Sequence, residues 1–300
     1  MNHPVPVLFM ITILDMIFGA AVQRILYPGK AEISLESIQE GNGIVVNDPL
    51  SCLCSIIASL LLVLLFAFLF RGEYRWKKKK GWFSEGAKLI WPIAFVPVLN
   101  LFGGSGLVPW SLVPVVVLNG LVPGIGEEVS IRGINVPNWM RLKRGNPRQI
   151  PVIATITALF FSLVHLSNLL LGASVGLTLL QVCYAFGIGV FFAAVYIRTG
   201  SLIWPVIMHS LIDITAFMNK ELYETGGLLQ TADFQLDYSV LISVAEGVLL
   251  AGLGYYYLRK EKRAEIKAMW DEKWPAREED VSGTDINVPF KLQEEETNGK

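Results

Sequence analysis

The chain has 300 residues, of which 53% are apolar and only 17% are charged, and its formal net charge at pH 7 is −1. A soluble domain carries about 25% charged residues, so this composition excludes a soluble globular fold and intrinsic disorder. Three cysteines are too few for a secreted disulfide scaffold, and the near-neutral charge argues against a nucleic-acid partner. The sequence therefore predicts an all-α integral membrane protein.

A helix that crosses a membrane needs about 20 mostly apolar residues. Eight segments approach this length. In chain order they are roughly Val5–Val22, Leu50–Phe70, Leu89–Phe102, Leu107–Arg132, Ile150–Leu171, Ser174–Ile197, Leu202–Asn219 and Tyr238–Leu258. The second is the clearest, whereas the third is short and interrupted by Pro92 and Pro97. We expect about eight transmembrane helices.

Basic residues between the spans predict their orientation, because cytoplasmic loops are enriched in Lys and Arg. The loop Arg71–Lys88 holds seven such residues, and further basic residues in the loop Gly133–Gln149, at Arg198 and after Leu258 fall on the same side. Both termini are therefore predicted in the cytoplasm, and a bacterial plasma membrane is the expected location. The run Lys77–Lys80 is interpreted as a topology determinant that touches anionic lipid.

This frame divides the chain into four parts. Residues 1–106 hold the first three helices, 107–219 a core of four helices, 220–258 an outer loop and the last helix, and 259–300 a charged cytoplasmic tail.

Ionisable residues inside spans cost a few kcal/mol, so each one needs a reason. In the fourth span, Arg132 follows Glu128 by four residues, which predicts an ion pair on one helical face. Glu127 is rotated by about 100° and stays unpaired. A free Glu beside a paired one suits a general base with a structural neighbour. The alternative is a plain salt bridge at a helix end.

Two further clusters lie in the fifth and seventh spans. Phe161 precedes His165 by one helical turn, so its ring can pack against one side of the imidazole. The alternative is that His165 is a buried core residue with a local hydrogen bond, for instance to Asn168. His209 and Asp213 share a face one turn apart. Three interpretations of this pair are possible: the carboxylate orients the imidazole, both side chains bind one metal ion, or the two form a buried structural pair.

Glu127, His165, His209 and Asp213 thus lie on three helices that can converge. A carboxylate and two imidazoles in one cavity can activate water and stabilise an oxyanion.

These clusters resemble the three motifs of the CPBP family of intramembrane proteases, which includes type II CAAX prenyl endopeptidases and bacteriocin-processing or immunity proteins of the Abi type. The motifs EExxxR, FxxxH and HxxxN/D match, in order, Glu127–Arg132, Phe161–His165 and His209–Asp213. The resemblance covers about Pro109–Phe217 and implies that spans four to seven form a catalytic bundle. It also implies a protease that cleaves a membrane-associated or prenylated peptide.

The resemblance further implies roles for the motif residues. Glu127 and His165 would hold and activate the attacking water, while His209 and residue 213 would stabilise the oxyanion. Glu128 and Arg132 would hold the helix that carries Glu127.

Asp213 departs from the family pattern, because the best-understood relatives carry Asn there. An ionised Asp would repel an oxyanion, so Asp213 must be protonated, orient His209, or ligate a metal. We prefer a metal-free glutamate mechanism. A zinc ion is the alternative, with Glu127, His165, His209 and Asp213 as candidate ligands.

Three competing interpretations remain at this stage. Gly103–Gly106 fits the rhomboid GxSG pattern around Ser105, although a Gly-rich turn explains it as well. A membrane scaffold or immunity protein could keep the fold without proteolysis. A proton-coupled transporter could use the same polar residues, but the sequence has no corresponding repeat between its halves. The expected partners are membrane lipid and a peptide or prenylated-protein substrate.

Overall fold

The computed structural model describes residues 49–69, 78–102, 106–143, 146–171, 173–220 and 238–274, and the structural statements below concern these residues. Apart from turns and one isolated bridge between Leu107 and Asn219, they are helical. The all-α prediction is therefore confirmed. The first expected span, Val5–Val22, lies outside the described residues, as do Ser105, the outer loop and the end of the tail.

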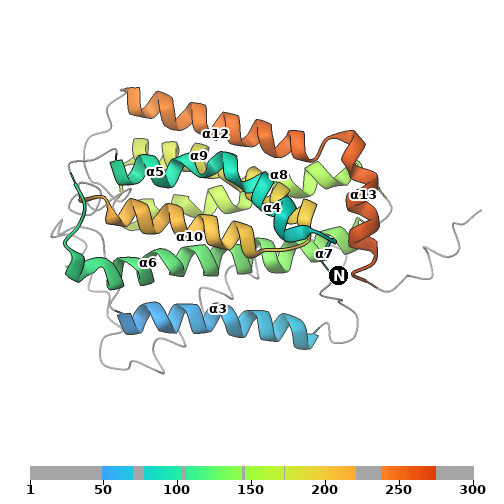
Figure 1. Cartoon of the computed structure of the whole chain (residues 1–300), viewed down its shortest axis with the longest axis horizontal. Helices are drawn as coiled ribbons and strands as arrows, with labels where there is room; N and C mark the ends of the chain where they lie inside the picture. The colour runs from blue at the N-terminus through green and yellow to red at the C-terminus, as the bar shows by residue number, and fades with distance from the viewer. Residues whose placement is uncertain are drawn as a thin grey trace, which may run out of the picture.

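The helices run side by side in one bundle, and α13 crosses one of its ends (Figure 1). In chain order they are α3 (Pro49–Leu69), α4 (Trp82–Ile90), the 3₁₀ turn η1 (Trp91–Ile93), α5 (Phe95–Phe102), the 3₁₀ turn η2 (Trp110–Leu112), α6 (Val113–Glu127), the π-helix η3 (Glu128–Ile134), α7 (Asn135–Leu142), α8 (Gln149–Val164), the 3₁₀ helix η4 (His165–Leu171), α9 (Val175–Thr199), α10 (Ile203–Met218), α12 (Tyr238–Tyr257) and α13 (Lys260–Asp271).

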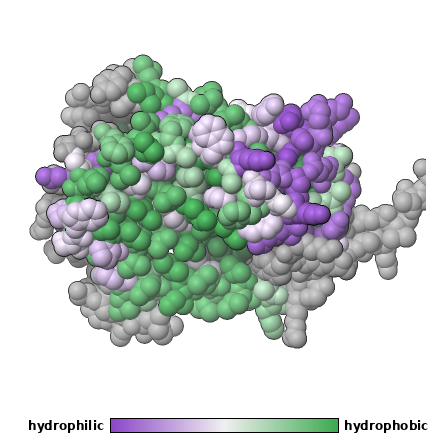
Figure 2. Space-filling view, viewed as in Figure 1, coloured by the Kyte–Doolittle hydropathy of each residue, from purple (hydrophilic) through white to green (hydrophobic). Residues whose placement is uncertain are grey.

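Four helical stretches are long and apolar enough to cross a membrane. They are Trp110–Leu142, Gln149–Leu169, Val175–Thr199 and Val240–Tyr257. The pair Trp82–Ile93 and Phe95–Phe102 is a fifth candidate if it forms one span bent by 41°. Apolar side chains cover the middle of the face shown in Figure 2, and charged ones gather at the end formed by α13. The integral membrane prediction is confirmed, whereas the count of eight spans stays a prediction.

Pro92 explains why the third expected span is broken. It sits at the start of η1, and the chain bends between the two halves of this segment. Proline lacks a backbone N–H and cannot continue the hydrogen-bonding pattern of an α-helix.

Small residues bring the motif-bearing helices α6 and α10 close together. α9 packs between α8 and α12, while α6 packs along α10. A Cβ atom at Gly124 of α6 would lie 2.6 Å from the backbone nitrogen of Ser210 on α10, so only glycine permits this approach. Close contact through small residues is a common way for membrane helices to associate. It places the end of α6 beside the residue that follows His209.

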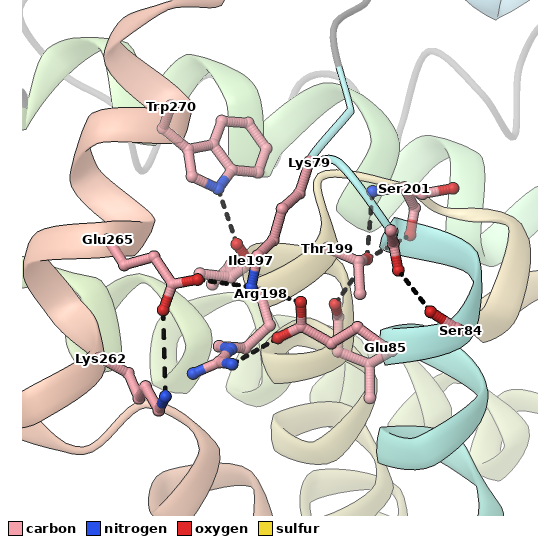
Figure 3. A network of polar contacts seen from close by, with 12 residues as sticks. Lys79, Ser84, Glu85, Ile197, Arg198, Thr199, Ser201, Lys262, Glu265 and Trp270 are labelled. Atoms are coloured by element: carbon pink, nitrogen blue, oxygen red, sulfur yellow. Dashed lines mark hydrogen bonds and ion pairs between the residues drawn. The ribbon is translucent and has the colours of Figure 1, made fainter.

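The polar end of the bundle is joined by ion pairs from three parts of the chain. Glu85 of α4 binds both Arg198, at the end of α9, and Lys79 (Figure 3). Lys79 also binds Glu265 of α13, and Trp270 donates its indole N–H to the carbonyl of Ile197 at 2.8 Å. Several segments that the sequence places on one side of the membrane therefore meet here. That this side is cytoplasmic stays a prediction.

Replacing Gly124 with Ala should force α6 away from α10. The added methyl group meets backbone atoms that cannot rotate away, so we expect a loss of about 1–3 kcal/mol in the free energy of unfolding. The change in the free energy of unfolding is measured on the purified protein in detergent. Gly252 of α12 is the matched control, because a Cβ there meets nothing within 4 Å. Its Ala variant should be neutral or slightly more stable, and equal behaviour of the two variants would refute the close-approach argument.

Candidate active site

The first motif lies where α6 changes into a π-helix. Glu127 is the last residue of α6, and η3 begins at Glu128. π-helical turns are rare in proteins overall, and many of those that occur lie at functional sites. The irregular backbone is supported locally, because Ser130 donates its hydroxyl to the carbonyl of Gly126 at 2.7 Å and Asn135 donates its amide to the carbonyl of Ser130 at 2.8 Å. The sequence predicted a helix as far as about Arg132 and a loop from Gly133. The structure instead has a π-helix over Glu128–Ile134, followed directly by α7.

Glu128 connects the first motif to the third. Its carboxylate pairs with Arg132, and both side chains are fully buried. The same oxygen, Oε1, lies 2.9 Å from Nδ1 of His209 on α10. An ionised carboxylate can only accept a hydrogen bond, so Nδ1 carries the proton in this contact. Glu128 thus fixes the orientation of the His209 ring, a contact that helix spacing alone could not predict.

The other ring nitrogen of His209 faces two carboxylates. Nε2 lies 3.4 Å from Oδ2 of Asp213 and 3.8 Å from Oε2 of Glu127. The side chains of Glu127 and Asp213 are 32% and 25% exposed, whereas that of Glu128 is fully buried. His209 therefore separates a fully buried ion pair on its Nδ1 side from two partly exposed carboxylates on its Nε2 side.

Two aromatic rings enclose this cluster. Phe161 of α8 meets both imidazoles edge-on, with ring centres 5.3 Å from His165 and 5.8 Å from His209. The guanidinium of Arg132 lies 4.4 Å from the centre of the Phe161 ring. Phe192 of α9 lies 5.8 Å from His209 and 5.7 Å from Arg132. Sequence reasoning missed Phe192, which belongs to no motif. Both rings can stabilise the buried cation through cation–π attraction.

His165 joins the cluster through Phe161. It is the first residue of η4, where the α8 helix tightens into 3₁₀ geometry. Asn168, its expected local partner, donates its amide to Oε1 of Gln181 at 2.8 Å instead. The structure therefore brings Glu127, Glu128, Arg132, His209 and Asp213 into direct ionic contact, and His165 contacts the same Phe161 ring that contacts His209.

The four residues that the sequence offers as zinc ligands do not fit a preformed metal site. Within the part of the chain that the structure describes, no three His, Cys, Asp or Glu side chains converge as a metal ion requires. His209 already uses Nδ1 to bind Glu128. We assign no chemical step to a metal.

Comparison with known families agrees with the motif assignment. Residues 109–215 match the family model described as Type II CAAX prenyl endopeptidase Rce1-like. The matched segment runs from just before η2 into α10 and contains all three motifs. Comparisons with curated proteins and with solved structures gave no match. The resemblance to the CPBP family of CAAX proteases is thereby confirmed over this segment, and the family is one of proteases.

Glu128→Gln should destabilise the protein far more than Glu127→Gln. The first change removes the charge that balances buried Arg132, which we expect to lower the free energy of unfolding by about 3–5 kcal/mol. The Glu127 side chain is 32% exposed, whereas its Oε2 is buried and accepts no hydrogen bond from any described residue, so replacing the carboxylate should have little effect on stability. Thermal unfolding in detergent compares the two. Equal stability of both variants would contradict the structural role of Glu128.

Proposed function

We propose that this protein is an intramembrane endopeptidase that hydrolyses a peptide bond of a membrane-associated or prenylated peptide, using water activated by Glu127 and His165. The observation that carries the proposal is the position of His209. Its ring is held by buried Glu128 on one side and presents Nε2 to the partly exposed side chains of Glu127 and Asp213 on the other. The match to a protease family over the same residues supports the reaction class.

Glu127 is the proposed general base. The 3.8 Å between its Oε2 and Nε2 of His209 is too long for a direct hydrogen bond, so Oε2 keeps its lone pairs for the attacking water. As the water oxygen attacks the scissile carbonyl carbon, one water proton passes to Glu127. The carbonyl π electrons move to its oxygen, which becomes the oxyanion. Glu127 then returns the proton to the leaving amine as the C–N bond breaks. His165, which contacts the same Phe161 ring as His209, is the second residue proposed to hold this water.

His209 is the proposed oxyanion donor. To donate from Nε2 it must carry protons on both ring nitrogens, because Nδ1 already donates to Glu128. The carboxylates of Glu128, Glu127 and Asp213 surround the ring and supply the counter-charge for that form. A preorganised charged donor of this kind is typically worth a factor of about 10²–10³ in rate.

Asp213 fits the role of orienting His209. It lies on the same helix, and its Oδ2 faces Nε2 at 3.4 Å. Its charge has to be neutralised when the oxyanion forms, either by a proton or by the positive charge of His209.

Glu127→Gln and His165→Ala should each lower turnover by about 10²–10⁴-fold, because each removes a group that handles the attacking water. The assay uses the full chain in lipid vesicles and an internally quenched peptide with a farnesylated cysteine near its C terminus, beside the same peptide without the lipid. Ser105→Ala is the control for rhomboid chemistry and should keep full activity. Unchanged turnover in either of the first two variants would remove the mechanism. An inactive wild type would favour the scaffold interpretation.

Asp213→Asn should retain turnover at least equal to that of the wild type. The amide keeps the size of the side chain, adds a donor for the oxyanion and removes a repulsive charge. Asp213→Leu keeps neither hydrogen-bonding group and should lose about tenfold or more, as expected for an oxyanion-hole defect. The same vesicle assay measures both. Loss of activity in the Asn variant as severe as in the Leu variant would show that the carboxylate itself is required.

A further inference from the structure

A cavity of about 230 Å³ lies beside η3 at the polar end of the bundle. Apolar residues from separate helices line it, among them Val63 of α3, Ile134 of η3 and Ile203 of α10. Glu127, His165, His209 and Asp213 are not among its lining residues, so the cavity is distinct from the candidate active site. Gly200, Ser201 and Leu202, in the turn between α9 and α10, also line it.

Two lysines, Lys78 and Lys273, also line this apolar cavity. Lys273 follows α13 and is only 1% exposed. Its Nζ lies 3.4 Å from the carbonyl oxygen of Gly200 and 5.0 Å from the ring centre of Trp270. Gly200 adopts a left-handed φ of +67°, and a Cβ there would lie 3.3 Å from Nζ, so glycine keeps the path of the lysine open.

The charges of the two lysines are close enough to influence each other. Burial, together with the positive charge of Lys78, lowers the pKa of Lys273 to about 8. Lys78 is exposed, and its Nζ lies 4.2 Å from the ring centre of Trp82. An anion bound between the two ammonium groups would reduce their repulsion and compensate the cost of burying Lys273.

We propose that this cavity binds an anionic membrane lipid, with its phosphate between Lys78 and Lys273 and an acyl chain along the apolar wall. Charge complementarity selects an anionic headgroup, and the apolar lining selects a chain attached to it. The surface of α3 favours a lipid over a peptide: Leu60, Leu64 and Phe68 are 51%, 62% and 71% exposed on the helix that supplies Val63. In Figure 1, α3 lies at the edge of the bundle beside α6, where acyl chains can reach it.

Occupancy of the cavity should stabilise the folded protein. Val129, Gly133 and Ile134 line it and belong to the same π-helix as Glu128 and Arg132. A ligand that binds only the folded state raises stability in proportion to the logarithm of its concentration above its dissociation constant.

The test uses the full chain in an uncharged detergent and follows thermal unfolding by tryptophan fluorescence. Phosphatidylglycerol, phosphatidylcholine and inorganic phosphate are titrated separately. We expect a saturable rise in the unfolding temperature with phosphatidylglycerol alone. Lys78→Gln and Lys273→Met should each raise the midpoint concentration about fivefold, as expected for one lysine near a lipid headgroup. Val63→Trp should weaken binding by filling the apolar wall. Native mass spectrometry of retained lipid gives a second readout that does not depend on stability.

Lys80→Gln is the matched control, because Lys80 is exposed in the same basic segment and does not line the cavity. It should bind phosphatidylglycerol as the wild type does. If Lys80→Gln weakened phosphatidylglycerol binding as much as the two lysine variants, the lipid would be held by general attraction to the basic surface and not by this cavity. If inorganic phosphate raised the unfolding temperature as much as phosphatidylglycerol, the cavity would be an anion site without lipid selectivity. A response to a prenylated peptide carboxylate, lost in Lys273→Met, with none to phosphatidylglycerol, would make it a peptide site and overturn the lipid proposal.

Discussion

The buried carboxylate of Glu128 is the interaction on which the rest of the candidate site depends. It pairs with Arg132 on its own π-helix and with Nδ1 of His209 on α10. A charge so deeply buried is tolerated only when its partners stay in place, because separating them leaves an uncompensated ion. The two helices are therefore fixed relative to each other by electrostatics as well as by packing. The same contact aims Nε2 of His209 at Glu127 and Asp213, so the buried ion pair and the proposed reactive groups both contact one imidazole.

The π-helical form of η3 gives this short element two functional faces. Glu128 and Arg132 point into the ionic cluster, while Val129 and Ile134 line the separate cavity near the polar end. A ligand in that cavity would press on the backbone that positions Glu128. The proposed lipid site and the proposed catalytic site are thus connected through seven consecutive residues, without any contact between a lipid and the reacting groups.

The sequence predicted the helical elements well, because long apolar runs and their breaks are local properties. α3, α9, α10 and α12 each begin and end within a few residues of the expected spans, and α8 together with η4 fills the fifth. The short helices α4 and α7 lie mostly in segments that were predicted to be loops. The Glu128–Arg132 pair was also predictable, since four residues separate its members. The bond from Glu128 to His209 joins residues 81 positions apart, and the packing of Phe192 against His209 comes from a helix without a motif. Such contacts arise only from tertiary packing. The π-helix was missed because its backbone is stabilised by Ser130 and Asn135, whose individual residue types also occur in ordinary helices.

Charge balance links the arrangement of the site to the proposed reaction. With Glu127, Glu128 and Asp213 ionised and with Arg132 and doubly protonated His209 charged, the cluster carries a net charge of about −1. Transfer of a water proton to Glu127 removes one negative charge as the oxyanion adds one, so the total does not change during attack. A buried site resists changes in net charge far more strongly than movement of charge within it. The proposed hydrolysis needs this compensation at the step where the tetrahedral intermediate forms.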